Sequence, residues 1–276
     1  MTVIAESNRR MTIVKQFALS CALLFTGFLG VVNATFAEPN VGVVVIHGKW
    51  DSPNGWMLSF ASNLNSSGFL VVSPEMLWSE RRAYDVDMAT WENEVTAAVK
   101  SLKDRGADKI CLAGHSSGGA GAVYFATRTK IDCLIALAPA PYPAFPKYHS
   151  AVSSDLSKAK DMVAKGQGDE KASFDDLNSG GRSKSIRMKA RIFIEQNDAG
   201  GPMDIDRNVG LILPNTPVLW IFGQKEEAPR RSNGDAAYAK IPDSVPKKFV
   251  EVPGDHLATP AESMGVAVAW LRETLK

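Results

Sequence analysis

Short apolar runs recur along the chain and alternate with segments of helical periodicity. The apolar runs are VGVVVI (41–46), FLVVS (69–73), KICLA (109–113), CLIALAP (133–139), PVLWIFG (217–223) and KFVEVPG (248–254). Runs without regular polar alternation are typical of parallel strands that are covered on both faces. Between two of these runs, residues 91–102 place their apolar positions on one helical face. We therefore expect an α/β fold with a mostly parallel central sheet and helices on both faces.

The interval between Pro139 and Pro217 breaks this alternation. It is too long for an ordinary connection between a strand and a helix, and it contains a segment of helical pattern at 153–165. We interpret residues 140–216 as an inserted cap. Within the cap, residues 166–185 are polar enough for a disordered loop.

The first 37 residues have the organisation of a secretory signal peptide. Three basic residues, Arg9, Arg10 and Lys15, precede an apolar run from Phe17 to Val32. Small residues follow at Thr35 and Ala37, where a signal peptidase requires them. We expect cleavage after Ala37, which leaves residues 38–276 as an exported protein, periplasmic or secreted, with no stable membrane span. The alternative is an uncleaved membrane anchor, because the run is near the lower length limit for a bilayer span.

Composition narrows the range of partners. Lys and Arg total 31 against 30 Asp and Glu, so no strong field favours nucleic acid, and we expect no nucleic-acid partner.

Outside the leading segment the cysteines are Cys111 and Cys133, and both lie in apolar strand-like runs. We expect them to be buried free thiols, since free Cys is common in cores, although export would permit a disulfide. We expect neither a metal nor a cofactor.

The stretch LAGHSSGG contains the candidate nucleophile. Gly114, Ser116 and Gly118 form G-x-S-x-G after a predicted strand and before a predicted helix. In that context the pattern indicates a nucleophile elbow, a strained turn whose flanking positions tolerate no side-chain bulk. A Walker loop would need a Gly-Lys pair before the Ser or Thr, and that pair is absent. The sequence therefore predicts Ser116 as an exposed nucleophile above the sheet.

A second turn supplies a candidate oxyanion hole. The first strong strand ends in IHGKW, residues 46–50. A turn there can direct the Lys49 backbone N–H toward Ser116, where it would act together with the N–H of Ser117. His47 precedes the turn glycine, and we expect it to be structural.

The general base must be one of four histidines, at positions 47, 115, 149 and 256. We expect His115, next to Ser116, to point away from the reacting atom and His149 to be exposed in the cap. His256 follows the last strand, so it lies at the same sheet edge as Ser116 and is our candidate for general base and acid. A carboxylate must orient it, and Glu226 or Glu227, after the strand at 217–223, is placed for this role.

Taken together, VVVIHGKW, LAGHSSGG, PVLWIFGQKEE and VPGDHLATP resemble the α/β-hydrolase superfamily from about residue 41 to the end. The chain order Ser116, Glu226, His256 is the order of that family. The resemblance implies the α/β-hydrolase fold, with the cap at the usual insertion site. The family commonly has aspartate where Glu226 stands, so the acid remains open between Glu226 and its neighbour Glu227.

The resemblance also implies an activity. Members with serine at this position are mostly esterases, lipases, thioesterases or related acyl hydrolases. We therefore expect a carboxylesterase-like or lipase-like serine hydrolase that cleaves small carboxylic esters or thioesters through an acyl-enzyme. Trp50, Tyr142 and Phe145 are candidates for lining its pocket. The alternatives are a non-catalytic binding protein with the same fold, and an acyltransferase or perhydrolase with the same triad.

Overall fold

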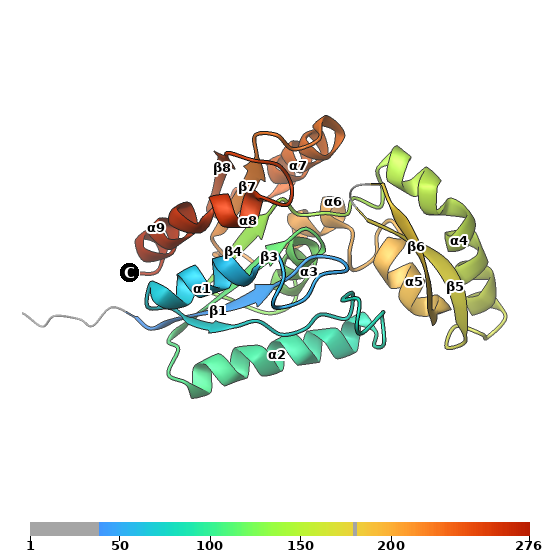
Figure 1. Cartoon of the computed structure of the whole chain (residues 1–276), viewed down its shortest axis with the longest axis horizontal. Coiled ribbons are helices and arrows are strands. Elements are labelled where there is room, and N and C mark those ends of the chain that lie inside the picture. Colours follow the sequence, from blue (N-terminus) through green and yellow to red (C-terminus); the bar gives the residue numbers. More distant parts are fainter. Residues whose placement is uncertain (1–38, 179–180) are drawn as a thin grey trace, which may run out of the picture. The chain divides into compact units, whose positions relative to one another are not determined.

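Six parallel strands form the central sheet, in the order β2-β1-β3-β4-β7-β8 (Figure 1). Their bounds are β1 (Val41–Ile46), β2 (Leu70–Val72), β3 (Lys109–His115), β4 (Cys133–Leu137), β7 (Val218–Gly223) and β8 (Lys247–Val252). These are the six apolar runs of the sequence, with ends shifted by at most two residues. The predicted parallel sheet is confirmed.

The computed structural model of the chain describes residues 39–178 and 181–276. The predicted signal peptide, residues 1–37, lies outside the described residues. Within the described ranges, no helix combines the length and the apolar character needed to cross a membrane.

Helices cover both faces of the sheet. The helices on one face are α2 (Met88–Asp104), α3 (Ser117–Ala126) and α7 (Ala228–Lys240), and those on the other are α1 (Leu58–Ser66), α8 (Thr259–Glu262) and α9 (Met264–Thr274). Successive side chains of a strand point to opposite faces: Val44 packs in the core under α2 and α3, and Val43 packs in the core under α1 and α9. Side chains on both faces of β1, β3, β4 and β7 are buried, which explains why these strands are almost continuously apolar.

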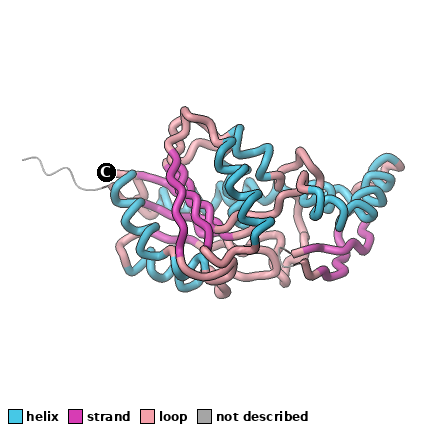
Figure 2. Tube along the Cα trace, turned by 90° about the horizontal axis from the view of Figure 1, so that it is seen from above, coloured by secondary structure: helices cyan, strands magenta, loops and turns pink. Residues whose placement is uncertain are grey.

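The cap lies between β4 and β7. Its elements are α4 (Pro146–Ala164), β5 (Lys171–Leu177), β6 (Ser183–Lys189), α5 (Ala190–Asn197), α6 (Ile205–Asn208) and the 3-10 helix η1 (Val209–Leu211). β5 and β6 form an antiparallel hairpin separate from the central sheet (Figure 2). Figure 1 shows this hairpin with α4 and α5 at one end of the sheet. The alternative of a disordered loop over 166–185 is wrong where β5 and β6 lie in this interval.

The expectation of free thiols is also wrong. Cys111 of β3 and Cys133 of β4 are joined by a disulfide. The two residues are direct partners in the register of these strands, and their Cα atoms lie 4.6 Å apart, a separation that a disulfide spans. Sequence spacing does not reveal the register of neighbouring parallel strands, so the pairing could not be derived from the sequence.

Candidate active site

Ser116 occupies a strained turn between β3 and α3. Its backbone angles are φ 53° and ψ −120°, a left-handed conformation that costs a non-glycine residue about 1–3 kcal/mol and must be held by its surroundings. The Ser116 N–H donates to the Leu137 carbonyl at 3.0 Å, and the Ser116 carbonyl accepts the Ala140 N–H at 3.1 Å. These bonds tie the turn to the end of β4 and to the segment that follows it.

The two predicted elbow glycines lie where no side chain fits. A Cβ atom added at Gly114 would overlap the carbonyl oxygen of Gly118. One added at Gly118 would overlap the carbonyl oxygens of Ile46 and His47 at the end of β1. Backbone atoms cannot yield as a flexible side chain can, so the turn depends on glycine at both positions.

Three side chains meet at the carboxyl edge of the sheet. Nε2 of His256, in the loop after β8, lies 3.0 Å from Oγ of Ser116. Nδ1 of the same ring lies 2.9 Å from Oε2 of Glu226, in the turn after β7. A carboxylate only accepts, so Nδ1 carries the proton and Nε2 accepts from the serine hydroxyl. The result is an ordered chain of hydrogen bonds from serine through histidine to glutamate.

The geometry separates the two adjacent glutamates. The Glu226 side chain is 1% exposed and also contacts the guanidinium of Arg230 through Oε1. The Glu227 side chain is 66% exposed and pairs with Nη2 of Arg230 at 3.0 Å. Of the two acids, the structure brings Glu226 to His256 and leaves Glu227 at the surface.

His115 lies beside the site and not away from it, so that expectation is wrong. Its ring centroid is 4.8 Å from that of His256, and it lines the same cavity as Ser116. Nε2 of His115 donates to the His256 backbone carbonyl at 2.8 Å. Burial, and then the nearby charge of His256, lower the pKa of His115 to about 3. A neutral His115 therefore supports the loop that carries His256.

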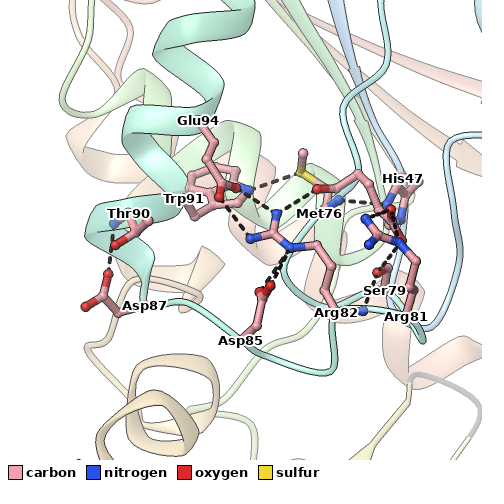
Figure 3. Close-up of polar contacts among 11 residues, drawn as sticks. His47, Met76, Ser79, Arg81, Arg82, Asp85, Asp87, Thr90, Trp91 and Glu94 are labelled. Atoms are coloured by element: carbon pink, nitrogen blue, oxygen red, sulfur yellow. Dashed lines mark hydrogen bonds and ion pairs between the residues drawn. The ribbon is translucent and has the colours of Figure 1, made fainter.

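His47 is structural, as expected. Its Nδ1 lies 2.8 Å from the Gly48 carbonyl, and its Nε2 accepts the Met76 N–H at 3.0 Å. Figure 3 shows the segment that carries Met76, where Arg82 reaches Glu94 of α2 at 2.7 Å. His149 is exposed on α4, as expected.

The two predicted oxyanion donors flank the serine. In the described part of the chain, neither the Lys49 N–H nor the Ser117 N–H has a hydrogen-bond acceptor. Both residues line the cavity that contains Ser116. The turn before Lys49 passes close to Ser116, since a Cβ atom at Gly48 would lie 3.3 Å from the Ser116 Cβ. Donors without partners beside a nucleophile are suited to an oxyanion hole.

The cavity over Ser116 has a volume of about 420 Å³, and Trp50 is one of its walls. A second cavity of about 320 Å³ adjoins it through Pro141 and Tyr148. Tyr142 and Phe145 line this second cavity and not the first. The predicted aromatic wall is thus divided between two adjoining cavities. Among the described residues, no cluster of three or more His, Cys, Asp or Glu side chains could hold a metal.

Sequence reasoning missed one buried group near the site. Asp176 of β5 is 0% exposed, and its carboxylate bonds to the side chains of Lys49, Trp50 and Tyr84. Its sequence neighbourhood is polar, which is the pattern that favoured a disordered loop. No local signal marks this aspartate as buried.

The chain belongs to the alpha/beta hydrolase family, whose model matches residues 43–269. Similar solved structures include one from the metagenome-derived lipolytic enzymes LipS and LipT, at 17% identity over 86% of this chain and 95% of that chain, with a TM-score of 0.60. A carboxyl esterase from Bacillus coagulans is 15% identical over 87% and 92% of the two chains, with a TM-score of 0.62. A monoacylglycerol lipase from Paleococcus ferrophilus is 18% identical over 86% and 98%, with a TM-score of 0.58. No curated protein matches the sequence.

At these identities the similar structures establish the fold. The expected α/β-hydrolase fold is therefore confirmed by the family match, by the six-stranded parallel sheet and by these similar structures.

Proposed function

We propose that the protein is an exported serine hydrolase that cleaves small carboxylic esters or thioesters through an acyl-enzyme. The observation that carries this proposal is the pair of hydrogen bonds, 3.0 Å and 2.9 Å long, that link Ser116 Oγ to His256 and His256 to Glu226. Similar solved structures that are esterases or lipases support the ester class.

In the proposed acylation step, Ser116 Oγ attacks the ester carbonyl carbon while His256 Nε2 takes the hydroxyl proton. Glu226 stabilises the resulting imidazolium through Nδ1–H. The carbonyl oxygen becomes an oxyanion, which accepts hydrogen bonds from the N–H groups of Lys49 and Ser117. Collapse of the tetrahedral intermediate expels the alcohol or thiol, which receives the proton from His256.

Deacylation repeats these steps with water as the nucleophile. His256 takes a proton from the water, whose oxygen attacks the acyl carbon bound to Ser116. The acid leaves, and the proton returns to Ser116 Oγ. The ester and one water molecule are consumed, and the alcohol or thiol and the acid are released, so the two steps balance.

The alternative of a non-catalytic binding protein is disfavoured by the same geometry. A binding protein has no need of an aligned serine, histidine and buried carboxylate, or of backbone strain at Ser116. Acyl transfer and perhydrolysis use the same residues, so the acyl acceptor must be determined from the products.

Export is the second part of the proposal. The leader-like residues 1–37 favour it, and the disulfide between Cys111 and Cys133 supports it, because disulfides persist in oxidising compartments.

The test of the proposed function uses the chain from Glu38 onward and p-nitrophenyl esters of graded acyl length. We expect free acid and p-nitrophenol as products, with Ser116→Ala lowering kcat by roughly 10⁴-fold or more. Circular dichroism must show that the variant is folded. Full activity in folded Ser116→Ala would refute the proposal, and an acylated acceptor as the sole acyl product would favour the transferase.

A further inference from the structure

A carboxylate of the cap is buried against the turn that carries one oxyanion donor. Asp176, in β5 of the cap hairpin, accepts from Lys49 Nζ at 2.6 Å, from Trp50 Nε1 at 2.7 Å and from Tyr84 Oη at 2.7 Å. Lys49 Nζ donates a second bond to the Leu177 carbonyl at 3.0 Å. Two of the three donors belong to the turn after β1, and the third belongs to the segment before α2. One side chain of the cap therefore fixes two separate parts of the core.

The Lys49–Asp176 pair is buried and charged. The side chains are 8% and 0% exposed. Burial by itself lowers the pKa of Lys49, but the charge of Asp176 and its hydrogen bond outweigh that effect, and the net pKa of Lys49 is raised. Removing one member of such a pair leaves the other charge buried without compensation.

The turn that Asp176 contacts is strained. Trp50 has φ 58°, an outlier conformation for a bulky residue that persists only where the surroundings impose it. Two bonds hold Trp50: its N–H donates to the Trp78 carbonyl at 2.9 Å, and its indole N–H donates to Asp176. The side-chain bonds from Lys49 and Trp50 to one carboxylate restrict how this turn can relax.

The same turn touches the nucleophile. Gly48 lies against Ser116, and the Lys49 N–H, without an acceptor in the described part of the chain, belongs to the wall of the Ser116 cavity. Any shift of the turn therefore changes the distance between this donor and an oxyanion formed at Ser116. Displacements of about 1 Å at such positions cost on the order of 10²-fold in rate.

We infer that Asp176 is a positioning residue: by binding the side chains of Lys49 and Trp50, this cap carboxylate fixes the backbone N–H of Lys49 as an oxyanion donor. The cap thereby completes the catalytic site as well as covering it. This inference rests on the proposed serine hydrolase function. Asp176 acts through Lys49 and touches no reacting atom.

The competing explanation is that Asp176 only holds the cap to the core. A second attachment of the cap, away from the Ser116 cavity, provides a control for this explanation. Arg191 of α5 pairs with Asp87, the residue that caps α2, at 2.6 Å, and neither residue lines the Ser116 cavity. Arg191→Gln therefore loosens the cap without touching the turn after β1. It is the matched control for Asp176→Asn, which keeps the shape of the side chain and removes its charge.

The experiment measures kcat and KM with p-nitrophenyl acetate, and the inhibition constant of an alkyl boronic acid, which forms a tetrahedral adduct on a catalytic serine. For Asp176→Asn we expect kcat to fall about 10-fold to 100-fold. This decrease in kcat should not exceed the decrease caused by removing a whole oxyanion donor. KM should change less than about threefold, because the donor acts in the transition state. The boronate inhibition constant should rise by about the same factor as kcat falls. Arg191→Gln should leave all three constants within about twofold of the unchanged protein.

An Asp176→Asn protein with unchanged kcat would overturn the inference, and so would a loss of kcat matched by Arg191→Gln. If Asp176→Asn does not fold, Tyr84→Phe decides, because it removes one hydroxyl that bonds Asp176 and leaves the cavity wall intact. We then expect kcat to fall severalfold at constant KM, and an unchanged kcat would overturn the inference. Failure of the proposed function is recognised separately, by equal turnover in the unchanged protein and Ser116→Ala.

Discussion

At the scale of single residues, environment gives two identical side chains different chemistry. Glu226 and Glu227 are neighbours, but one carboxylate is buried against His256 and the other is solvated. A buried carboxylate fixes the tautomer and orientation of the imidazole and stabilises its protonated form, whereas a solvated one contributes little through a screened surface pair.

Replacing each glutamate by glutamine separates these roles. Glu226→Gln should lower kcat/KM by roughly 10²-fold to 10⁴-fold, because the amide leaves His256 without its stabilising negative charge. Glu227→Gln should keep kcat/KM within about threefold of the value for the unchanged protein, since this variant loses only an exposed ion pair with Arg230. Steady-state kinetics on one p-nitrophenyl ester measures both. An equal loss in the two variants would contradict the assignment of Glu226.

His115 predicts a dependence of stability on pH. Its pKa is lowered to about 3 in the folded chain by burial and then by the charge of His256, against about 6.5 when unfolded. The unfolded state therefore binds more protons between pH 6.5 and 3, and the free energy of unfolding falls as pH decreases through that window.

His115→Gln removes this titration and keeps an N–H donor for the His256 carbonyl. Between pH 7 and pH 5, the unchanged protein should lose on the order of 2 kcal/mol more stability than the variant. Urea unfolding at the two pH values measures the difference. Equal decreases in the free energy of unfolding in the two proteins would show that His115 is not the cause of the pH dependence.

The sequence determines part of the site at this scale. Ser116 is marked by its glycines and His256 by its place after the last strand, because strand order brings both to one edge. The choice between Glu226 and Glu227 depends on a turn that directs one side chain inward, and adjacent positions carry no signal of that direction. The role of Asp176 depends on contacts with residues more than ninety positions away, Lys49, Trp50 and Tyr84 among them.

At the scale of elements, the strand-turn-helix unit of β3 and α3 depends on close backbone packing. Gly118 of α3 lies directly against the carbonyl oxygens of Ile46 and His47 at the end of β1. This approach brings the turn after β1 and the turn that carries Ser116 together, so the helix and the strand must meet without a side chain between them.

A pair of glycine substitutions tests this packing. Gly118→Ala should destabilise the chain by more than about 4 kcal/mol or prevent folding, because a Cβ there meets backbone that cannot move aside. Gly265→Ala, in α9, meets nothing within 4 Å and should raise stability by up to about 1 kcal/mol through helix propensity. Thermal unfolding of both variants makes the comparison. A well-folded Gly118→Ala would contradict the described packing.

Elements differed in how well the sequence predicted them. The four inner strands β1, β3, β4 and β7 are recognisable because their burial on both faces requires nearly continuous apolar sequence. The hairpin of β5 and β6 was not, because only Phe174 and Asp176 of β5 are buried, and one of these is charged. A charged residue at an inward position removes the apolar alternation that indicates a strand. The burial of the Asp176 charge is compensated by hydrogen bonds from Lys49, Trp50 and Tyr84, which lie far away in the sequence.

At the scale of the whole molecule, the disulfide links the fold to its proposed compartment. Cys111 and Cys133 join neighbouring strands in the middle of the sheet, where both are fully buried. A bond there can form only if the cysteines meet an oxidising environment before or during folding.

Alkylation of the chain from Glu38 onward tests the disulfide. After denaturation without reductant, we expect no alkylated cysteine, and after reduction we expect alkylation at both Cys111 and Cys133, as measured by intact mass. The material should come from an oxidising compartment of the expressing cell. Two alkylated cysteines without prior reduction would contradict the disulfide and remove one support for export.

If Ser116 is an activated nucleophile, as we propose, a reagent that is specific for such serines must label it. The measurement is reaction of the chain from Glu38 onward with a fluorophosphonate, followed by mass mapping of the modified peptide. We expect one adduct, on Ser116, that is absent in Ser116→Ala and lost in His256→Ala. A folded protein that remains unlabelled, or an adduct on another residue, would contradict this proposal.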